Sequence, residues 1–207
     1  MRVNECFDAE IEEYEKWFNE NDKLLSNEIN IIKQLLPDFN KGIEIGVGTG
    51  IFASKLGIKN GVEPSKKMAS KAIERGICVE IGKAENLPVA DECYNLALMV
   101  TVDCYLNDVF KAFLEVNRIL VKNGVFVIAF LDKSTPLGKI YEDNKHLDKN
   151  YKYATFHSYK EISDWLIKAN FEIMDRKQTI YSLDNDYQEI KTGSGEGVFV
   201  VIKAKKQ

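Results

Sequence analysis

The sequence lacks the excess of basic residues that a nucleic-acid-binding protein needs. Its 28 lysines and arginines are outnumbered by 32 aspartates and glutamates, which gives a formal charge of −4. Phosphate binding requires a concentrated basic surface. The only dense basic cluster is Lys203, Lys205 and Lys206, which we interpret as a solvated strand end. We therefore expect no nucleic-acid partner.

Long hydrophobic runs are also missing. The most apolar runs, Leu96–Val102 and Val125–Leu131, have seven residues each, whereas a helix that crosses a bilayer needs about 20. The first eight residues, MRVNECFD, lack the apolar centre of a secretory signal. We expect a cytoplasmic protein without a membrane span.

Cysteine and histidine are scarce and unpatterned. The four cysteines (6, 78, 93 and 104) have no C-x-x-C spacing, and the two histidines, His146 and His157, have no paired ligand spacing. In a protein without an export signal, such cysteines are best interpreted as reduced thiols. We expect no metal site.

What the sequence does contain is an apolar strand signal that runs into three glycines. Lys41–Ile45 leads to Gly46, Gly48 and Gly50, and a helical pattern begins at Ile51. Glycine permits a tight turn and close approach of the backbone to a ligand. A strand, glycine-rich turn and helix together form the ligand crevice at the carboxyl edge of an α/β sheet.

The remaining pattern alternates between strand and helix, which predicts a single α/β domain with a mostly parallel sheet and helices on both faces. Strands are expected at 42–45, 58–63, 77–81, 94–100, 125–131, 171–182 and 196–203. Helices are expected at 5–20, 26–36, 51–56, 66–75, 107–121 and 159–169. Gly124 is expected to take the left-handed position after the fifth of these helices.

Four segments are expected within the single domain 1–207. Residues 1–37 would be helical, 38–132 would form the ligand-binding core, 133–158 would be a cap, and 159–207 would add a helix and strands. Tyr14, Trp17 and Phe18 share one helix face. They would either pack on the domain as an ordinary amphipathic helix or form a lid over the crevice.

The glycine register bears on the ligand. A dinucleotide site has the pattern G-x-G-x-x-G, but Ile51 stands where the third glycine belongs, and Glu44 precedes the loop. A carboxylate there would repel a pyrophosphate. The sequence therefore argues against the alternative of an NAD(P)-dependent Rossmann enzyme. The phosphate-binding P-loop pattern is also absent.

The stretch Glu44–Gly50 resembles motif I of the class I S-adenosylmethionine-dependent methyltransferases. More closely, the chain is similar to the small-molecule group that includes the ubiquinone and menaquinone biosynthesis methyltransferases. Further matches follow in order at 61–65, 82–88, 94–101 and 118–125. The resemblance covers roughly residues 14–203. It implies a Rossmann-like, doubly wound, seven-stranded sheet with an antiparallel C-terminal strand, and S-adenosyl-L-methionine as the cofactor.

The resemblance also implies which residues bind that cofactor. Glu63, 17 residues after Gly46, would hold the ribose hydroxyls, and Glu44 would face the amino or sulfonium end. Each also has a structural interpretation: Glu63 as a turn acid, Glu85 as a solvated charge, Met68 as core and Thr101 as a strand end. Lys83 stands where the family offers an aspartate to adenine. The predicted cofactor residues are Glu44, Gly46, Val47, Gly48, Thr49, Gly50, Glu63, Pro64, Ser65, Met68, Ala84, Glu85, Val100 and Thr101.

The implied reaction is in-line methyl transfer to a small-molecule acceptor, which gains mainly from orientation. The acceptor would lie between the first helix and the cap, and the enzyme would be a monomer or homodimer. A cofactor-binding module without catalysis is the other alternative. Asp132, Tyr141, Tyr153 and His157 are candidate general bases, and no catalytic residue is assigned. The predicted substrate residues are Tyr14, Trp17, Tyr141, Tyr153 and His157.

Overall fold

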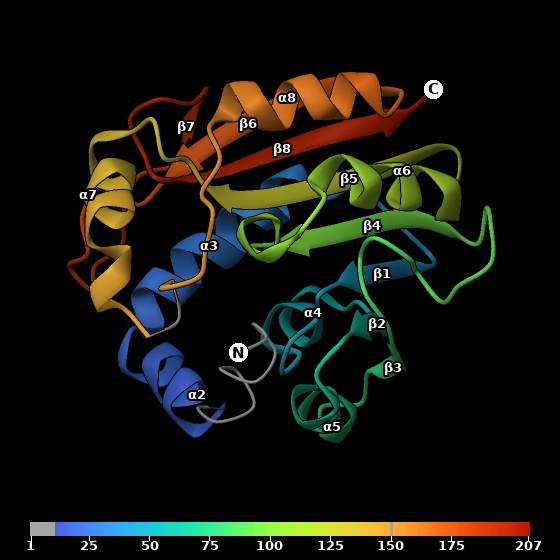
Figure 1. Cartoon of the computed structure of the whole chain (residues 1–207), viewed down its shortest axis with the longest axis horizontal. Coiled ribbons are helices and arrows are strands. Elements are labelled where there is room, and N and C mark those ends of the chain that lie inside the picture. Colours follow the sequence, from blue (N-terminus) through green and yellow to red (C-terminus); the bar gives the residue numbers. More distant parts are fainter. Residues whose placement is uncertain (1–10, 150) are drawn as a thin grey trace.

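A computed structural model describes residues 11–149 and 151–207 and shows a twisted sheet of eight strands between helices (Figure 1). The strand order is β3-β2-β1-β4-β5-β8-β6-β7, with β1 to β5 parallel and β8 antiparallel to both β5 and β6. This confirms the predicted Rossmann-like fold with an antiparallel C-terminal strand. The strands are β1 (Gly42–Ile45), β2 (Asn60–Glu63), β3 (Cys78–Ile81), β4 (Tyr94–Val100), β5 (Leu120–Leu131), β6 (Phe171–Thr179), β7 (Lys191–Thr192) and β8 (Phe199–Lys206).

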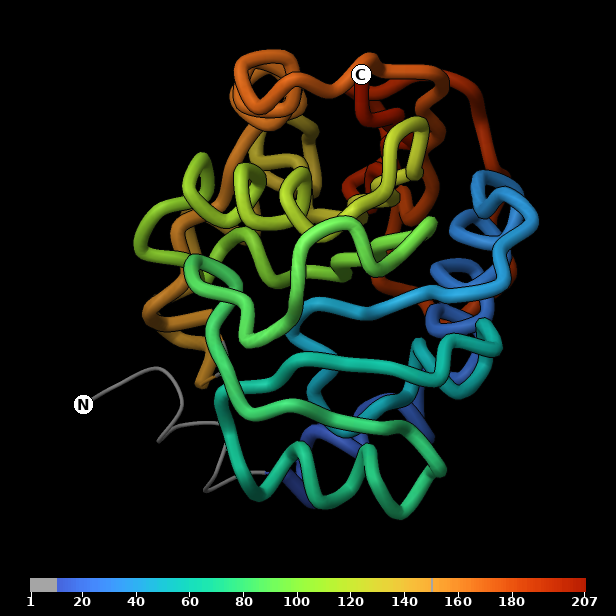
Figure 2. The backbone as a smooth tube through the Cα atoms, turned by 90° about the vertical axis from the view of Figure 1, so that its right-hand side faces the viewer, coloured from blue at the N-terminus to red at the C-terminus, as the bar shows by residue number. Residues whose placement is uncertain are grey.

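Helices lie against both faces of the sheet (Figure 2), and two apolar layers hold them there. Helices α3 (Asp22–Leu35) and α4 (Ile51–Leu56) bury their apolar side chains in one layer, and α6 (Val109–Ile119) and α8 (Tyr159–Lys168) do so in the other. The central strand β4 is buried along nearly its whole length, as a parallel strand covered on both faces requires. No helix in the described part of the chain has the length and apolar character needed to cross a bilayer.

The connections between strands fix where a ligand can bind. From β1 the sheet continues through β2 and β3 on one side and through β4 and β5 on the other. Loops that leave neighbouring strands in opposite directions open a crevice at the carboxyl ends of those strands. The first helical turn after β2 is fixed locally, because the Ser65 hydroxyl accepts a hydrogen bond from the Met68 N–H and caps α5 (Lys66–Glu74).

The segments at both ends of the core provide helices near this crevice. Helix α2 (Ile11–Glu20) precedes α3, while the segment after β5 contains α7 (Pro136–Asn144) and the short helix η2 (Lys145–Leu147). The expected start of the first helix, at residue 5, lies outside the described residues. An exposed ion pair of 3.2 Å between Lys149 and Glu13 joins the two segments. The assignment of 1–37 as a lid and of 133–158 as a cap stays a prediction.

Several local expectations differ from the structure. Leu120 and Val121, expected in a helix, belong to β5, and residues 180–182, expected in a strand, lie beyond the end of β6. Asn123 takes the left-handed backbone (φ 63°), not Gly124, because asparagine also tolerates that conformation. The sheet has an eighth strand, the two-residue β7, which pairs with β6 through Lys177 and Gln178. A two-residue strand carries no periodicity, so sequence patterns could not reveal it.

Candidate active site

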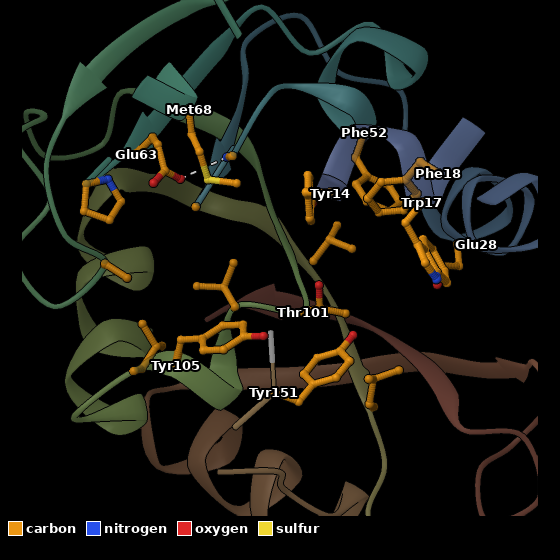
Figure 3. A pocket seen from close by; sticks show the side chains of 18 of the residues that line it. Tyr14, Trp17, Phe18, Glu28, Phe52, Glu63, Met68, Thr101, Tyr105 and Tyr151 are labelled. Atoms are coloured by element: carbon orange, nitrogen blue, oxygen red, sulfur yellow. Dashed lines mark hydrogen bonds between the residues drawn. The ribbon is translucent and has the colours of Figure 1, made fainter. Parts of the chain in front are cut away.

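A cavity of about 830 Å³ lies at the carboxyl ends of β1, β2 and β4. Glu63 and Met68 lie at one end, and Glu28 lies with Trp17 and Phe18 at the other (Figure 3). Predicted site residues that line the cavity are Tyr14, Trp17, Gly46, Gly48, Glu63, Pro64, Met68, Ala84, Glu85, Val100, Thr101 and Tyr141. The fold therefore brings together residues that the sequence spreads over more than a hundred positions.

Glu63 ends β2 with its carboxylate held in place by backbone groups. One oxygen accepts a hydrogen bond from the Gly48 N–H and the other from the Ser65 N–H, both at 2.9 Å. These backbone donors fix the direction in which the two carboxylate oxygens point, and a carboxylate has about four acceptor positions in all. The side chain is 6% exposed and lines the cavity. This fixed acceptor pair suits a ligand with two adjacent hydroxyls.

The three glycines of the loop have different structural roles. A Cβ on Gly46 would lie 2.4 Å from Val102, and one on Gly50 would lie 2.6 Å from Ile77, so these two glycines permit tight packing of the protein itself. A Cβ on Gly48 would approach only the Tyr14 hydroxyl, at 4.0 Å. Gly48 therefore presents bare backbone to the cavity, where a ligand can approach closely.

The other predicted cofactor residues lie behind the cavity wall. Val47, Thr49, Gly50 and Ser65 do not line the cavity. Glu44 does not line it either: this side chain is 1% exposed, and burial raises its pKa well above the ordinary value, with the Ala53 N–H opposing the shift. The structure therefore offers no direct contact between Glu44 and a ligand, and its predicted role stays untested.

The loop after β3 is tied to the helices beside it. Glu85 accepts a hydrogen bond from the Asn107 N–H at 2.9 Å, so its carboxylate is engaged with the chain as well as lining the cavity. Arg118 donates to the carbonyls of Leu87 and Val89 at 3.1 and 2.9 Å. This clamp holds the loop against α6, so Ala84 and Glu85 present a fixed wall.

The candidate bases and acceptor residues fall into two groups. Tyr14, Trp17 and Tyr141 line the cavity, whereas Tyr153, His157 and Asp132 do not. Tyr153 is 45% exposed on the surface. His157 is buried, and its Nδ1 lies 2.9 Å from Oδ2 of Asp103, while Asp132 is fully buried and accepts from Ser134. The structure thus engages His157 and Asp132 in internal contacts.

Among the cavity residues that were not predicted from the sequence are Glu28, Tyr105 and Tyr151. Glu28 follows Leu24 by four positions and precedes Ile32 by four, so a charged residue stands on the apolar face of α3. That position is the signal that could have identified it. Burial raises the pKa of Glu28 to about 8. Tyr105 and Tyr151 come from η1 (Asp103–Tyr105) and from the segment after η2, where no periodic pattern marks them.

Comparison with known proteins identifies the family. A methyltransferase domain family matches residues 43–128. An uncharacterised protein of Methanocaldococcus jannaschii is 43% identical over 202 residues, which cover 97% of this chain and 98% of that one. A crystal structure from Thermotoga maritima, described as a S-adenosylmethionine-dependent methyltransferase and possible histamine N-methyltransferase, is 42% identical, covers 100% of both chains and superposes with a TM-score of 0.95.

More distant structures share the fold. A S-adenosylmethionine-dependent methyltransferase from Mesorhizobium loti superposes with a TM-score of 0.65 at 18% identity, over 84% of this chain and 95% of that one. The chain belongs to the class I S-adenosylmethionine-dependent methyltransferases, and its cofactor is S-adenosylmethionine. The narrower resemblance to the quinone methyltransferases stays a prediction.

The residues present fit this cofactor better than a dinucleotide. Four carboxylic side chains line the cavity (Glu28, Glu63, Glu85 and Asp148), against one cation, Lys83, among the described lining residues. A pyrophosphate would meet mostly like charge there. S-adenosylmethionine carries a ribose, which Glu63 can bind, and supplies an electrophilic methyl group on a cationic sulfur.

Helix α2 is joined to the glycine loop through Arg75. The guanidinium donates to the Thr49 carbonyl at 2.8 Å and to the Glu15 carboxylate, so α5, the loop and α2 meet at one side chain. Partial burial acts to raise the pKa of Glu15, but hydrogen bonds and charge from Arg75 hold it below the ordinary value. A carboxyl with a lowered pKa contributes stability that is complete at neutral pH and is lost as the pH falls through that lowered pKa.

We expect Arg75→Met to loosen α2. Removing a charge-assisted hydrogen bond of about 1.5 kcal/mol should speed amide hydrogen exchange in Ile11–Glu20 about tenfold at neutral pH. The control is Lys16→Met on the same helix, whose partner Glu20 is 63% exposed; that pair should contribute little. Equal exchange in wild type and Arg75→Met would show that α2 is held by its aromatic contacts alone.

Proposed function

We propose that the protein transfers the methyl group of S-adenosylmethionine to a small-molecule acceptor inside the cavity. The observation that carries this proposal is the shape of the site. One cavity of about 830 Å³ has Glu63 at one end, suited to the cofactor, and Trp17 and Phe18 at the other (Figure 3). Small-molecule sites typically measure about 300–1,000 Å³. Once a cofactor occupies one end, the remaining space suits a metabolite rather than a macromolecular chain.

Orientation is the main catalytic contribution that these residues can make. Gly48 and Glu63 would fix the cofactor, and Tyr14, Trp17 and Tyr141 would confine the acceptor against it. Holding two reactants in line can contribute up to about 7–11 kcal/mol. The aromatic walls would also exclude water. The description of the Thermotoga relative as a possible histamine N-methyltransferase supports an acceptor of this small size.

The test is acceptor-dependent formation of S-adenosylhomocysteine, measured by mass spectrometry. The purified protein would be given S-adenosylmethionine and, in separate reactions, small amines, phenols, carboxylates, quinone precursors, protein and RNA. We expect product only with one class of small molecule. Methylation of protein or RNA alone would overturn the proposal.

A further inference from the structure

The acceptor end of the cavity contains a carboxylate that nothing in the described protein neutralises. Glu28 lines the cavity from α3. In the described part of the chain, no group donates a hydrogen bond to its side chain or forms an ion pair with it. Lys83, on the loop after β3, is the one cation among the lining residues that the structure describes. Glu63 and Glu28 lie at opposite ends of the cavity (Figure 3). A charged group left unpaired in a protein interior is costly, and such a group shifts its pKa toward the neutral form instead, so the Glu28 carboxylate is favoured only when a cation pairs with it.

Aromatic rings lie at the same end of the cavity as Glu28 (Figure 3). The ring centroids of Trp17 and Phe18 are 5.0 Å apart, and Phe18 packs on Phe52 at 5.9 Å. Burial raises the pKa of the Tyr14 and Tyr141 phenols, and the negative charge of Glu28 raises both further. Aromatic faces attract cations, and phenols that stay protonated can donate hydrogen bonds without adding negative charge.

We propose that Glu28 is the acceptor-binding residue of this site and that the acceptor carries a protonated amine. The ammonium group would pair with the Glu28 carboxylate, and the aromatic side chains of α2 and α7 would cover the carbon skeleton. This inference rests on the proposed function, since it names the substrate class of the same cavity. It identifies the acceptor by its charge and leaves open which of its atoms receives the methyl group.

Binding of such an amine should release a proton. Burial raises the pKa of Glu28 to about 8, so at pH 7 the empty site is mostly neutral, whereas the pair with an ammonium requires the carboxylate. Among the described residues, the tyrosines whose pKa the charge of Glu28 helps to raise are Tyr14 from α2, Tyr141 from α7 and Tyr151 from the segment after η2. Asp148 is a further carboxyl that lines the cavity and acts on Tyr141 and Tyr151. The raised pKa values of these tyrosines keep them protonated. Affinity for an amine should therefore rise about tenfold from pH 6 to pH 7 and about fivefold from pH 7 to pH 8, where about half of the Glu28 groups are already ionised.

Calorimetry on the full chain saturated with S-adenosylhomocysteine tests the inference. The probes are a panel of alkyl and aralkyl amines, each with its neutral alcohol isostere, such as 2-phenylethylamine and 2-phenylethanol. Titration at pH 7 in two buffers of different ionisation enthalpy counts the released protons. We expect nearly one proton released per amine bound, the stated rise in affinity with pH, and weaker binding of each alcohol.

The decisive variant is Glu28→Gln, which keeps the shape and removes the charge. It should bind the amine at least ten times more weakly, without proton release or pH dependence. The matched control is Glu74→Gln, an exposed glutamate on α5, which should bind as wild type does. Binding of S-adenosylhomocysteine would show that the Glu28→Gln protein is folded. If that variant does not fold, the number of protons that the wild-type protein releases on binding an amine still tests the role of Glu28.

Three outcomes would overturn the inference: no amine binds, an alcohol binds as tightly as its amine, or Glu28→Gln binds the amine as wild type does. Methyl transfer to a neutral small molecule by a protein that binds no amine would leave the proposed function standing and remove only the role of Glu28. If the protein binds amines with proton release but methylates only macromolecules, the role of Glu28 in amine binding would stand and the proposed function would be overturned.

Discussion

Glu63→Ala is expected to weaken binding of S-adenosylhomocysteine about a hundredfold or more. The lost carboxylate would accept a hydrogen bond from each ribose hydroxyl, and hydrogen bonds to a charged group are worth about 1.5–3 kcal/mol each. Two of them correspond to roughly a hundredfold or more in affinity. The substitution also leaves the N–H groups of Gly48 and Ser65 without their present acceptor. Calorimetry measures the loss directly.

The matched control is Glu80→Ala on the neighbouring strand β3, where the glutamate is exposed and does not line the cavity. The Glu80→Ala protein should bind S-adenosylhomocysteine with the affinity of wild type. A dissociation constant for Glu63→Ala within threefold of wild type would show that the cofactor ribose is held elsewhere.

His157→Ala is expected to lower the free energy of unfolding by about 3–5 kcal/mol. The substitution removes the partner of Asp103, which is 2% exposed, and the ring that packs on Trp165. Burial already raises the pKa of Asp103, and His157 opposes that rise. Without the imidazole, the buried carboxyl would lose its hydrogen-bond partner. Chemical denaturation gives the change.

The same variant separates a structural histidine from a catalytic one. A general base contributes about a hundredfold or more to rate, whereas turnover per folded His157→Ala molecule should fall less than tenfold, because His157 lies outside the cavity. His146→Ala is the control, since the other histidine is exposed and should change stability by less than about 0.5 kcal/mol. Unchanged stability with lost turnover would restore His157 as a candidate base.

The sequence could predict which residues lie at the Glu63 end of the cavity because that end is local. Gly46, Gly48 and Glu63 follow β1 and β2 directly, and neighbouring parallel strands end at the same edge of the sheet. The rest of the cavity depends on tertiary packing. Glu28 on α3, Tyr105 in η1 and Tyr151 after η2 line the same cavity only because three separate elements converge on it. A charge on an apolar helix face was the one visible sign.

The most direct measurement is a crystal structure of the protein with S-adenosylhomocysteine bound. We expect both ribose hydroxyls within hydrogen-bonding distance of the Glu63 carboxylate, the backbone of Gly48 against the ligand, and the Glu28 end of the cavity left open for an acceptor. A ligand whose ribose lies away from Glu63, or whose amino group pairs with Glu28, would contradict this division of the cavity.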